Sequence, residues 1–347
     1  MSRNHLIEGS GPLLDEEGRL REPGYALRPP FEYSHDRIAA SDLRIKDWDY
    51  YLIEDSDYGV ALTFADLGYM GLVSASVLNF GMGTYQTTSE LVVMPRGSMG
   101  VPTSSTEGDI VWQNKRCRVR FAHERGGRRL SFYMARFREQ DELDVEVFLD
   151  NEPRDSMVIC TPWPENHKAF YYNRKILGMR ATGGFRWGPK VHEFDPAEAV
   201  GLLDWGRGVW TYDNVWYWAA AQGHVAGTLV ALNLGYGFGD TSAASENMVF
   251  VDGIAHKLDE VDFGIPQNDD GTYDYMRPWH MTDNEGRLDL VFDPQIDRVD
   301  DIDVGGIVKS WQHQVFGKLA GFVVLDDGTK LNIHDLRCSA EHIHNKY

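Results

Sequence analysis

Residues 142–149 read ELDVEVFL, and this short stretch shows the alternation that decides the fold class. Leu143, Val145, Val147 and Leu149 fall at every second position, and Glu142, Asp144 and Glu146 alternate with them. Successive side chains of a β-strand point to opposite faces, so the pattern predicts an antiparallel strand with one buried and one solvated face. The same alternation occurs in two other segments. Their apolar positions are Cys117, Val119 and Phe121 in one and Leu288, Leu290 and Phe292 in the other.

Turn signals separate many such runs. Four dipeptides typical of hairpins lie between β-prone segments: Gly126-Gly127, Asp252-Gly253, Asp270-Gly271 and Asp327-Gly328. Helical periodicity is nearly absent, and residues 192–203 (HEFDPAEAVGLL) are the best candidate for a short connecting helix because Asp195 can cap it. These signals predict a β-meander.

Two runs, 225–234 and 319–325, are apolar on both faces. Such strands are expected where one face lines a closed interior and the other packs against another part of the chain. We therefore predict an all-β protein of two antiparallel halves, in which a cavity-bearing barrel explains these runs better than a sandwich with one wet face. The expected division is an irregular arm over 1–45, a first barrel over 46–190 and a second over 191–347.

The bulk composition excludes several classes of protein. The net charge of −19 would repel phosphate backbones, so nucleic acid is not an expected partner. No segment is long and apolar enough for a membrane span, and the first residues lack an export signal. Three cysteines without paired spacing indicate reduced thiols. A cytoplasmic location is expected, and the oligomeric state is left open.

The densest group of chemically distinctive residues lies in 201–239, GLLDWGRGVWTYDNVWYWAAAQGHVAGTLVALNLGYGFG. Its tryptophans supply large, stiff apolar surface, and its charges are unfavourable to bury without a partner. We expect GLLDWGRG to form a turn that opens the second barrel, with Asp204 facing a closed apolar chamber. In that chamber Asp204 would act as a proton donor, and indoles would stabilise a carbocation by cation–π attraction.

Several segments resemble the domain of unknown function 2804 family: GLLDWGRGVW, NVWYWAAAQG, NLGYGFGD, SENMVFVDG, YMRPW and QVFGKLAGFVVLDDGT. The resemblance covers nearly the whole chain. That family is distantly similar to tandem lipocalin-like proteins, among them carotenoid hydratases and tocopherol cyclase. Several of these carry an Asp-His-x-Trp-Gly stretch, of which Asp204, Trp205 and Gly206 retain the acid and the Trp-Gly while the histidine is missing.

The resemblance implies two antiparallel lipocalin-like (calycin-like) barrels in tandem. It also implies a protein that handles a hydrophobic isoprenoid, polyene or lipid, with acid-catalysed hydration, isomerisation or cyclisation as the candidate chemistry. The candidate catalytic residues are Asp204, Arg207, Tyr212, Glu246 and His280. The candidate ligand-binding residues are Trp205, Trp210, Trp216, Trp218, Tyr236, Trp279 and His313. Trp216 and Trp218 should share one strand face, with Tyr217 on the other.

Other interpretations stay open at this point. Asp204 and Arg207 could form a buried pair that only holds a turn, and each tryptophan could be ordinary core. The protein could be a lipid or isoprenoid carrier or sensor without catalysis, or a carbohydrate-active protein with sugar platforms. We expect no cofactor and no metal, because the histidine-rich segment IHDLRCSAEHIHNKY is more typical of a solvated terminus than of a metal site.

Overall fold

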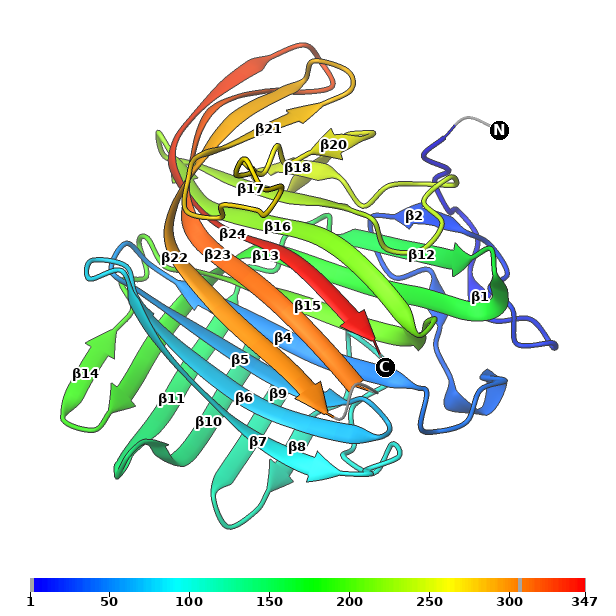
Figure 1. Ribbon diagram of the computed structural model, residues 1–347, viewed down its shortest axis with the longest axis horizontal. Helices are drawn as coiled ribbons and strands as arrows, with labels where there is room; N and C mark the ends of the chain where they lie inside the picture. Colours follow the sequence, from blue (N-terminus) through cyan, green and yellow to red (C-terminus); the bar gives the residue numbers. More distant parts are fainter. Residues whose placement is uncertain (1–2, 305–307, 347) are drawn as a thin grey trace.

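The computed structural model describes residues 3–304 and 308–346, and it consists almost entirely of β-strands (Figure 1). Among these residues the only helical segment is the 3-10 turn η1 (His35–Arg37). None of the helical structure in that part of the chain has the length and apolarity needed to cross a membrane. The predicted all-β class, with two barrel-like antiparallel sheets in tandem, is confirmed.

The first sheet has 13 strands and curls around one core. Its main path runs β7 (Thr84–Val93), β6 (Met70–Asn79), β5 (Tyr58–Asp66), β4 (Lys46–Glu54), β15 (Val200–Val209), β13 (Asn166–Trp187), β11 (Asp141–Asp150), β10 (Gly127–Arg138), β9 (Cys117–Glu124) and β8 (Ile110–Gln113). Off this path, β12 (Met157–Trp163) and β14 (Lys190–Glu193) pair with β13, and β2 (Gly24–Ala26) pairs with β12.

The second sheet has nine strands and is also antiparallel throughout. Its order is β19 (Ile254–Lys257), β18 (Met248–Val251), β17 (Thr228–Tyr236), β16 (Asp213–Val225), β24 (Lys330–Lys346), β23 (Val308–Val324), β22 (Leu288–Val304), β21 (Trp279–Asp283) and β20 (Val261–Asp262). The predicted hairpin at Asp252-Gly253 joins β18 to β19, and both residues have positive φ (48° and 75°), as a type I′ turn requires.

Residues 3–45 are mostly irregular and lie on the first sheet. This segment contains β2 and a small parallel pair of β1 (Gly11–Pro12) and β3 (Phe31–Glu32). Leu13, Leu14 and Phe31 are buried in the core of the first sheet, so apolar burial holds the segment in place.

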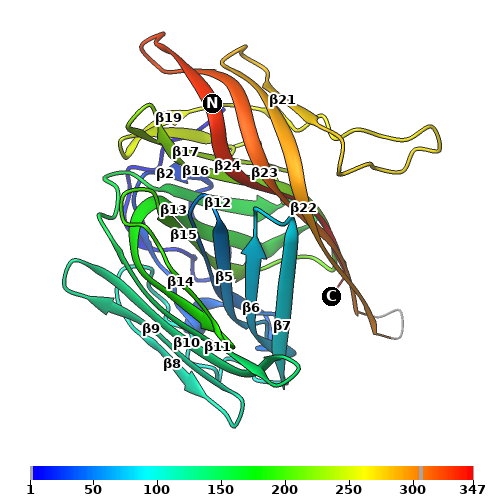
Figure 2. The same cartoon turned by 90° about the vertical axis from the view of Figure 1, so that its left-hand side faces the viewer.

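Three apolar cores follow from the arrangement of the sheets. One fills the interior of the first sheet and one the interior of the second. The third lies between the sheets, where β16 and β17 pack on β13 and β15, as Figure 2 shows. Because strand side chains alternate, the same strands supply the inter-sheet layer and the interiors.

Three local expectations are wrong. The GLLDWGRG stretch is not a turn: it forms β15, which pairs with β4 and β13 in the middle of the first sheet. The last strand of the first sheet ends at Val209, and the first strand of the second sheet begins at Asp213. Residues 192–203 make only a single turn, with the Ala199 amide donating to the Asp195 carbonyl at 2.7 Å, because β15 begins at Val200.

The third wrong expectation concerns the histidine-rich segment. Residues 333–346 belong to β24, which lies between β16 and β23 near the middle of the second sheet (Figure 1). Residues 336–343 are buried there. Cross-strand pairing on both sides outweighs the polar composition that suggested a solvated end.

Candidate functional site

The inter-sheet layer contains a buried centre of charge built on two neighbouring strands of the first sheet. Lys175 of β13 lies directly opposite Asp204 of β15 in the antiparallel register. The alternation of β15 points Asp204 toward the second sheet, while Leu203 and Trp205 point into the first interior. Lys175 is 2% exposed and Asp204 is 8% exposed, so water screens their interaction weakly.

The Lys175 ammonium connects the two sheets. Its Nζ atom lies 3.7 Å from Asp204 Oδ1 and 3.1 Å from Oε2 of Glu246, which comes from the second sheet's side. It also donates to the Tyr171 hydroxyl at 3.1 Å and to Asn173 Oδ1 at 2.9 Å. Burial alone would lower the pKa of Lys175, but the two carboxylates outweigh it and raise that pKa, so the side chain is a cation at neutral pH.

Both carboxylates accept further hydrogen bonds from neutral donors. Asp204 Oδ1 accepts from the Asn173 amide at 2.5 Å, and Oδ2 accepts a long bond of 3.4 Å from the Trp48 indole. Glu246 Oε2 accepts from the Asn233 amide at 3.0 Å. Amides and indoles that donate without carrying charge leave the net charge of the centre negative.

Two glycines make room for this arrangement. A Cβ atom on Gly206 would lie 1.9 Å from the Trp48 ring, and one on Gly235 would lie 2.5 Å from Glu246 Oε1. Of the Trp205-Gly206 pair in β15, the glycine is therefore the residue that this arrangement requires. A larger residue at position 206 would displace the Trp48 indole that bonds to Asp204.

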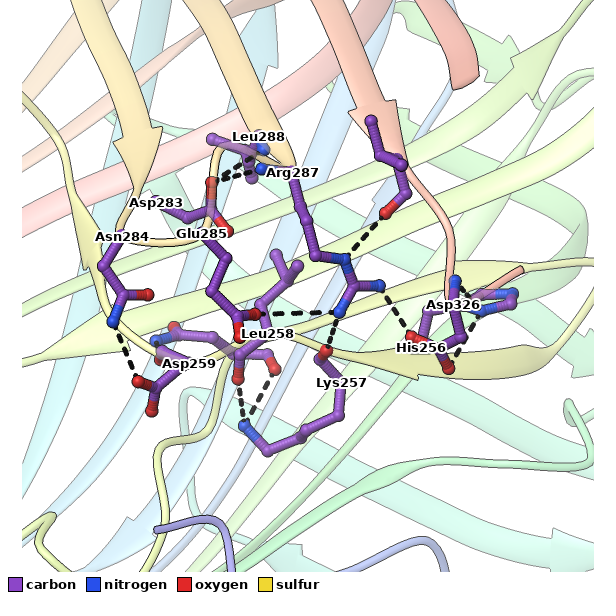
Figure 3. A network of polar contacts seen from close by, with 12 residues as sticks. His256, Lys257, Leu258, Asp259, Asp283, Asn284, Glu285, Arg287, Leu288 and Asp326 are labelled. Atoms are coloured by element: carbon purple, nitrogen blue, oxygen red, sulfur yellow. Dashed lines mark hydrogen bonds and ion pairs between the residues drawn. The ribbon is translucent and has the colours of Figure 1, made fainter. Parts of the chain in front are cut away.

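A polar network fixes the segment that carries Glu246. The Lys257 ammonium donates to Ser245 Oγ at 2.7 Å and to the Asn247 carbonyl at 3.1 Å, on either side of Glu246. Figure 3 shows the neighbouring anchor, where Arg287 donates to the Lys257 carbonyl at 2.7 Å and to Asp326 at 2.6 Å. Glu246 is thus held from outside the layer as well as by Lys175.

A third acid, Glu341 of β24, faces the same layer. It accepts from the Trp216 indole at 2.9 Å and from the Gln314 amide at 3.2 Å. Burial raises the pKa of Glu341 to about 7, and the negative charge of Asp204 adds to the shift. Glu341 can therefore hold a proton at neutral pH, as a general acid must.

Aromatic rings surround the charged groups of this layer. Trp48 stacks on Tyr171 at a centroid distance of 6.0 Å and meets Trp210 edge-on at 5.4 Å. The Lys175 ammonium lies 4.9 Å from the centroid of the Trp218 ring. The site is thus a charged centre within an aromatic layer, rather than the apolar chamber expected from the sequence.

Five of the predicted residues come together here: Asp204, Glu246, Trp210, Trp216 and Trp218. The prediction that Trp216 and Trp218 share a face is confirmed, because Tyr217 packs in the second interior.

Arg207 and Trp205 lie on the opposite face of β15 from Asp204, so the alternative in which Asp204 and Arg207 form a buried pair is wrong. Three positions along a strand reverse the direction of the side chain. Arg207 is fully buried in the first interior, where it donates to Asp49 at 2.9 Å and to the Pro102 and Trp48 carbonyls at 2.7 and 2.6 Å. The Arg207 guanidinium also lies over the ring of Trp205 in a cation–π contact.

The remaining predicted residues lie apart from Asp204. Tyr212 is 46% exposed between β15 and β16, and His280 is exposed on β21, where it pairs with Asp289 at 2.9 Å. Tyr236, Trp279 and His313 belong to the interior side of the second sheet. They pack in an aromatic cluster on the face of that sheet that points away from Asp204.

The sequence interpretation missed Lys175, Asn173, Asn233, Glu341 and Phe238. The signal for Lys175 was a lysine within the apolar run AFYYNRKILGM, whereas Glu341 falls within the histidine-rich segment, whose polar composition suggested solvent. Their partners are not visible in the sequence, since Trp216 and Glu341 are 125 residues apart.

Two hollows lie elsewhere in the structure. One, of about 10 Å³, lies within the first sheet beside Asp49 and Arg128. The other, of about 440 Å³, lies against β8–β11 and is bordered by Arg118 and Tyr133. No three His, Cys, Asp or Glu side chains of residues 3–304 and 308–346 group in a way that could hold a metal ion.

Comparisons with known proteins agree with the fold. Residues 4–347 match the family described as domain of unknown function (DUF2804). No curated protein sequence matches the chain. Among solved structures, a protein described as a putative AttH from Nitrosomonas europaea is similar, with 13% identity, a TM-score of 0.54, and coverage of 90% of this chain and 95% of that one.

A second solved structure, kievitone hydratase from Nectria haematococca, has 10% identity and a TM-score of 0.49, with coverage of 87% of this chain and 88% of that one. At 13% identity, the similarity to the putative AttH shows the fold and does not transfer an activity.

Proposed function

The chain thus belongs to the DUF2804 family, and from the geometry of its inter-sheet site we propose that it binds a largely apolar small molecule between its two sheets and transfers protons to and from it. The observation that supports this most is the buried contact of Lys175 with two carboxylates inside a layer of indoles and phenols. Functional sites are where such strongly interacting ionisable groups are concentrated.

The proposed reaction is acid-catalysed hydration of a carbon–carbon double bond, or the related isomerisation or cyclisation. Protonated Glu341 gives its proton to one alkene carbon, which leaves a carbocation on the other. Trp216 and Trp218 stabilise that cation through their ring faces, and the carboxylate of Asp204 stabilises it by charge.

Water then adds to the cation and loses a proton to the Glu341 carboxylate, so the net change is one water added and the acid is restored. In isomerisation or cyclisation the cation loses a carbon-bound proton instead. Lys175 is proposed to keep Asp204 and Glu246 in place through this cycle, because its ammonium contacts both.

Access to the layer is consistent with a small ligand. Trp48, Trp216, Phe238 and Glu246 are partly exposed, whereas Trp210 and Trp218 are only 4% and 6% exposed. Sugar platforms are open rings, so the burial of these indoles disfavours the carbohydrate alternative.

The test begins with native mass spectrometry of the purified protein to identify a co-purified apolar ligand. The ligand is then incubated with the wild type, Asp204→Asn and Glu341→Gln in isotopically labelled water. We expect the wild type to add one labelled water or to change the ligand's double-bond pattern, and both variants to lose this activity while keeping the native circular dichroism spectrum.

If the ligand is unchanged after incubation with the wild type, the protein would be a carrier and not an enzyme. Full activity in Asp204→Asn would remove this carboxylate from the mechanism. His280→Gln, which changes an exposed pair far from the site, is the matched control and should keep full activity.

A further inference from the structure

One aromatic side chain at the site is surrounded by four others. The Phe238 ring lies 4.9 Å from Trp163, 5.0 Å from Tyr171, 5.4 Å from Trp210 and 5.2 Å from Trp216, measured between ring centroids. The interplanar angles are 89°, 88°, 73° and 67°, so each contact is close to edge-on. We call these four surrounding rings the aromatic box.

Phe238 reaches the aromatic box from outside the strands. It lies in the segment between β17 and β18, flanked by Gly237 and Gly239 with φ of 91° and 70°. It is partly exposed, whereas Trp163, Tyr171 and Trp210 are buried. Phe238 is thus a solvent-side ring on an irregular segment, and most of the box is fixed in strands.

The aromatic box shares its walls with the charged centre. The Tyr171 hydroxyl accepts from Lys175 at 3.1 Å, and the Trp216 indole donates to Glu341 at 2.9 Å. The segment that carries Phe238 also carries Glu246 at its other end. A group held in the box would therefore lie beside the groups proposed to move protons.

We propose that the aromatic box is the subsite for a planar aromatic or conjugated ring of the ligand, and that Phe238 occupies it when no ligand is bound. Four edge-on partners favour a flat ring with a quadrupole, because each contact brings a positive ring edge toward a negative ring face. A saturated ring of the same size is thicker and lacks that charge pattern. This inference rests on the proposed function and narrows its substrate class.

The first test follows the Phe238 ring itself in the full-length protein. 4-Fluorophenylalanine is incorporated, the Phe238 signal is assigned by its loss in Phe238→Leu, and 2-naphthol is added while fluorine NMR spectra are recorded. We expect the Phe238 signal to move toward the position of solvent-exposed fluorophenylalanine with 2-naphthol and to stay unchanged with the saturated analogue decahydro-2-naphthol. An unchanged signal with both probes, or the same change with both, would overturn the proposal.

The second test uses affinity. Phe238→Ala should bind 2-naphthol about tenfold more tightly than the wild type, because the competing ring is removed, and should gain much less for decahydro-2-naphthol. Phe148→Ala, which removes a partly exposed phenylalanine on the outer face of β11, is the matched control and should change neither affinity.

Equal gains in affinity for both probes in Phe238→Ala would mean that each probe only fills the void left by the phenyl ring. That result would contradict a subsite for planar rings. These readouts need no turnover, so they can succeed or fail independently of the Asp204→Asn and Glu341→Gln activities.

Discussion

Arg174 and Lys175 are neighbours on β13, yet they serve two different polar networks on the two faces of the first sheet. Inside the sheet, Arg174 donates to Glu152 at 2.7 Å and to Ser156 Oγ at 3.0 Å, and Arg207 is held by a carboxylate and backbone carbonyls. Between the sheets, Lys175 contacts two carboxylates, an amide and a phenol, and each of these four groups belongs to a side chain.

The difference indicates two roles. A guanidinium has a rigid planar set of donors and suits fixed, many-sided contacts, whereas an ammonium is a compact charge on a flexible stem. In the interior network Arg207 binds backbone carbonyls, whose positions are set by the fold, and this indicates a structural role. The inter-sheet network binds side chains that can change protonation or position, as a reaction needs. Four predictions test this contrast.

Arg207→Met should have the largest effect, because Arg207 is fully buried and its removal leaves Asp49 and the Pro102 and Trp48 carbonyls without their donor. We expect the free energy of unfolding to fall by about 3–5 kcal/mol, measured by urea denaturation. Arg120→Met, at an exposed ion pair, should change it by less than about 0.5 kcal/mol. Equal effects of the two variants would contradict a structural role for Arg207.

Lys175→Met should lower the free energy of unfolding by about 2–4 kcal/mol, because Asp204 and Glu246 would then face each other without a cation. Adding Asp204→Asn to Lys175→Met should recover part of that loss, since one of the two like charges is removed. Urea denaturation of the double variant measures the recovery. A double variant less stable than Lys175→Met would show that packing, not charge, dominates here.

Glu341 and Glu54 should make stability depend on pH in a defined direction. Burial raises the pKa of each from 4.5 to about 7. The folded state therefore holds protons that the unfolded state has lost, so the stabilising contribution is complete below pH 4.5 and disappears as the pH rises through 7.

The loss per glutamate should be about 3 kcal/mol. Urea denaturation at a series of pH values measures it, and Glu341→Gln should flatten the part due to that residue. A wild type and a Glu341→Gln variant with the same pH dependence would contradict the shift.

Trp216→Phe should have the smallest effect, because it removes one hydrogen bond and keeps a ring. The indole of Trp216 lowers the pKa of Glu341 by donating to it, so the variant should raise that pKa further. Carboxyl carbon NMR titration of Glu341 measures the change, and stability above neutral pH should fall by about 1 kcal/mol. A lower pKa in the variant would mean that the indole does not stabilise the carboxylate.

The strand pattern could be predicted from the sequence because alternation and turn chemistry are local. The alternation at 142–149 predicted β11, and the same rule separated Tyr217 from Trp216 and Trp218. It would also have separated Asp204 from Arg207 if GLLDWGRG had been interpreted as a strand rather than as a turn.

The rest of the site depends on pairings between distant segments. That Lys175 lies opposite Asp204 follows from β13 pairing with β15, and that Glu341 lies beside Trp218 follows from β24 pairing with β16. No local signal encodes these registers, since many strands in the chain have similar patterns. The domain boundaries at 45 and 190, a cytoplasmic location and a small-molecule partner stay predictions.

The position of β24 between β16 and β23 has a consequence for how the molecule assembles. One long side of β16 lacks its neighbour until a segment 125 residues away has been translated and has docked. Contacts of such sequence separation close slowly, so the nascent second half exposes a bare strand edge for a time during synthesis. Glu341 belongs to that strand, so the residue that we propose as the proton donor takes its place only when the second sheet is complete.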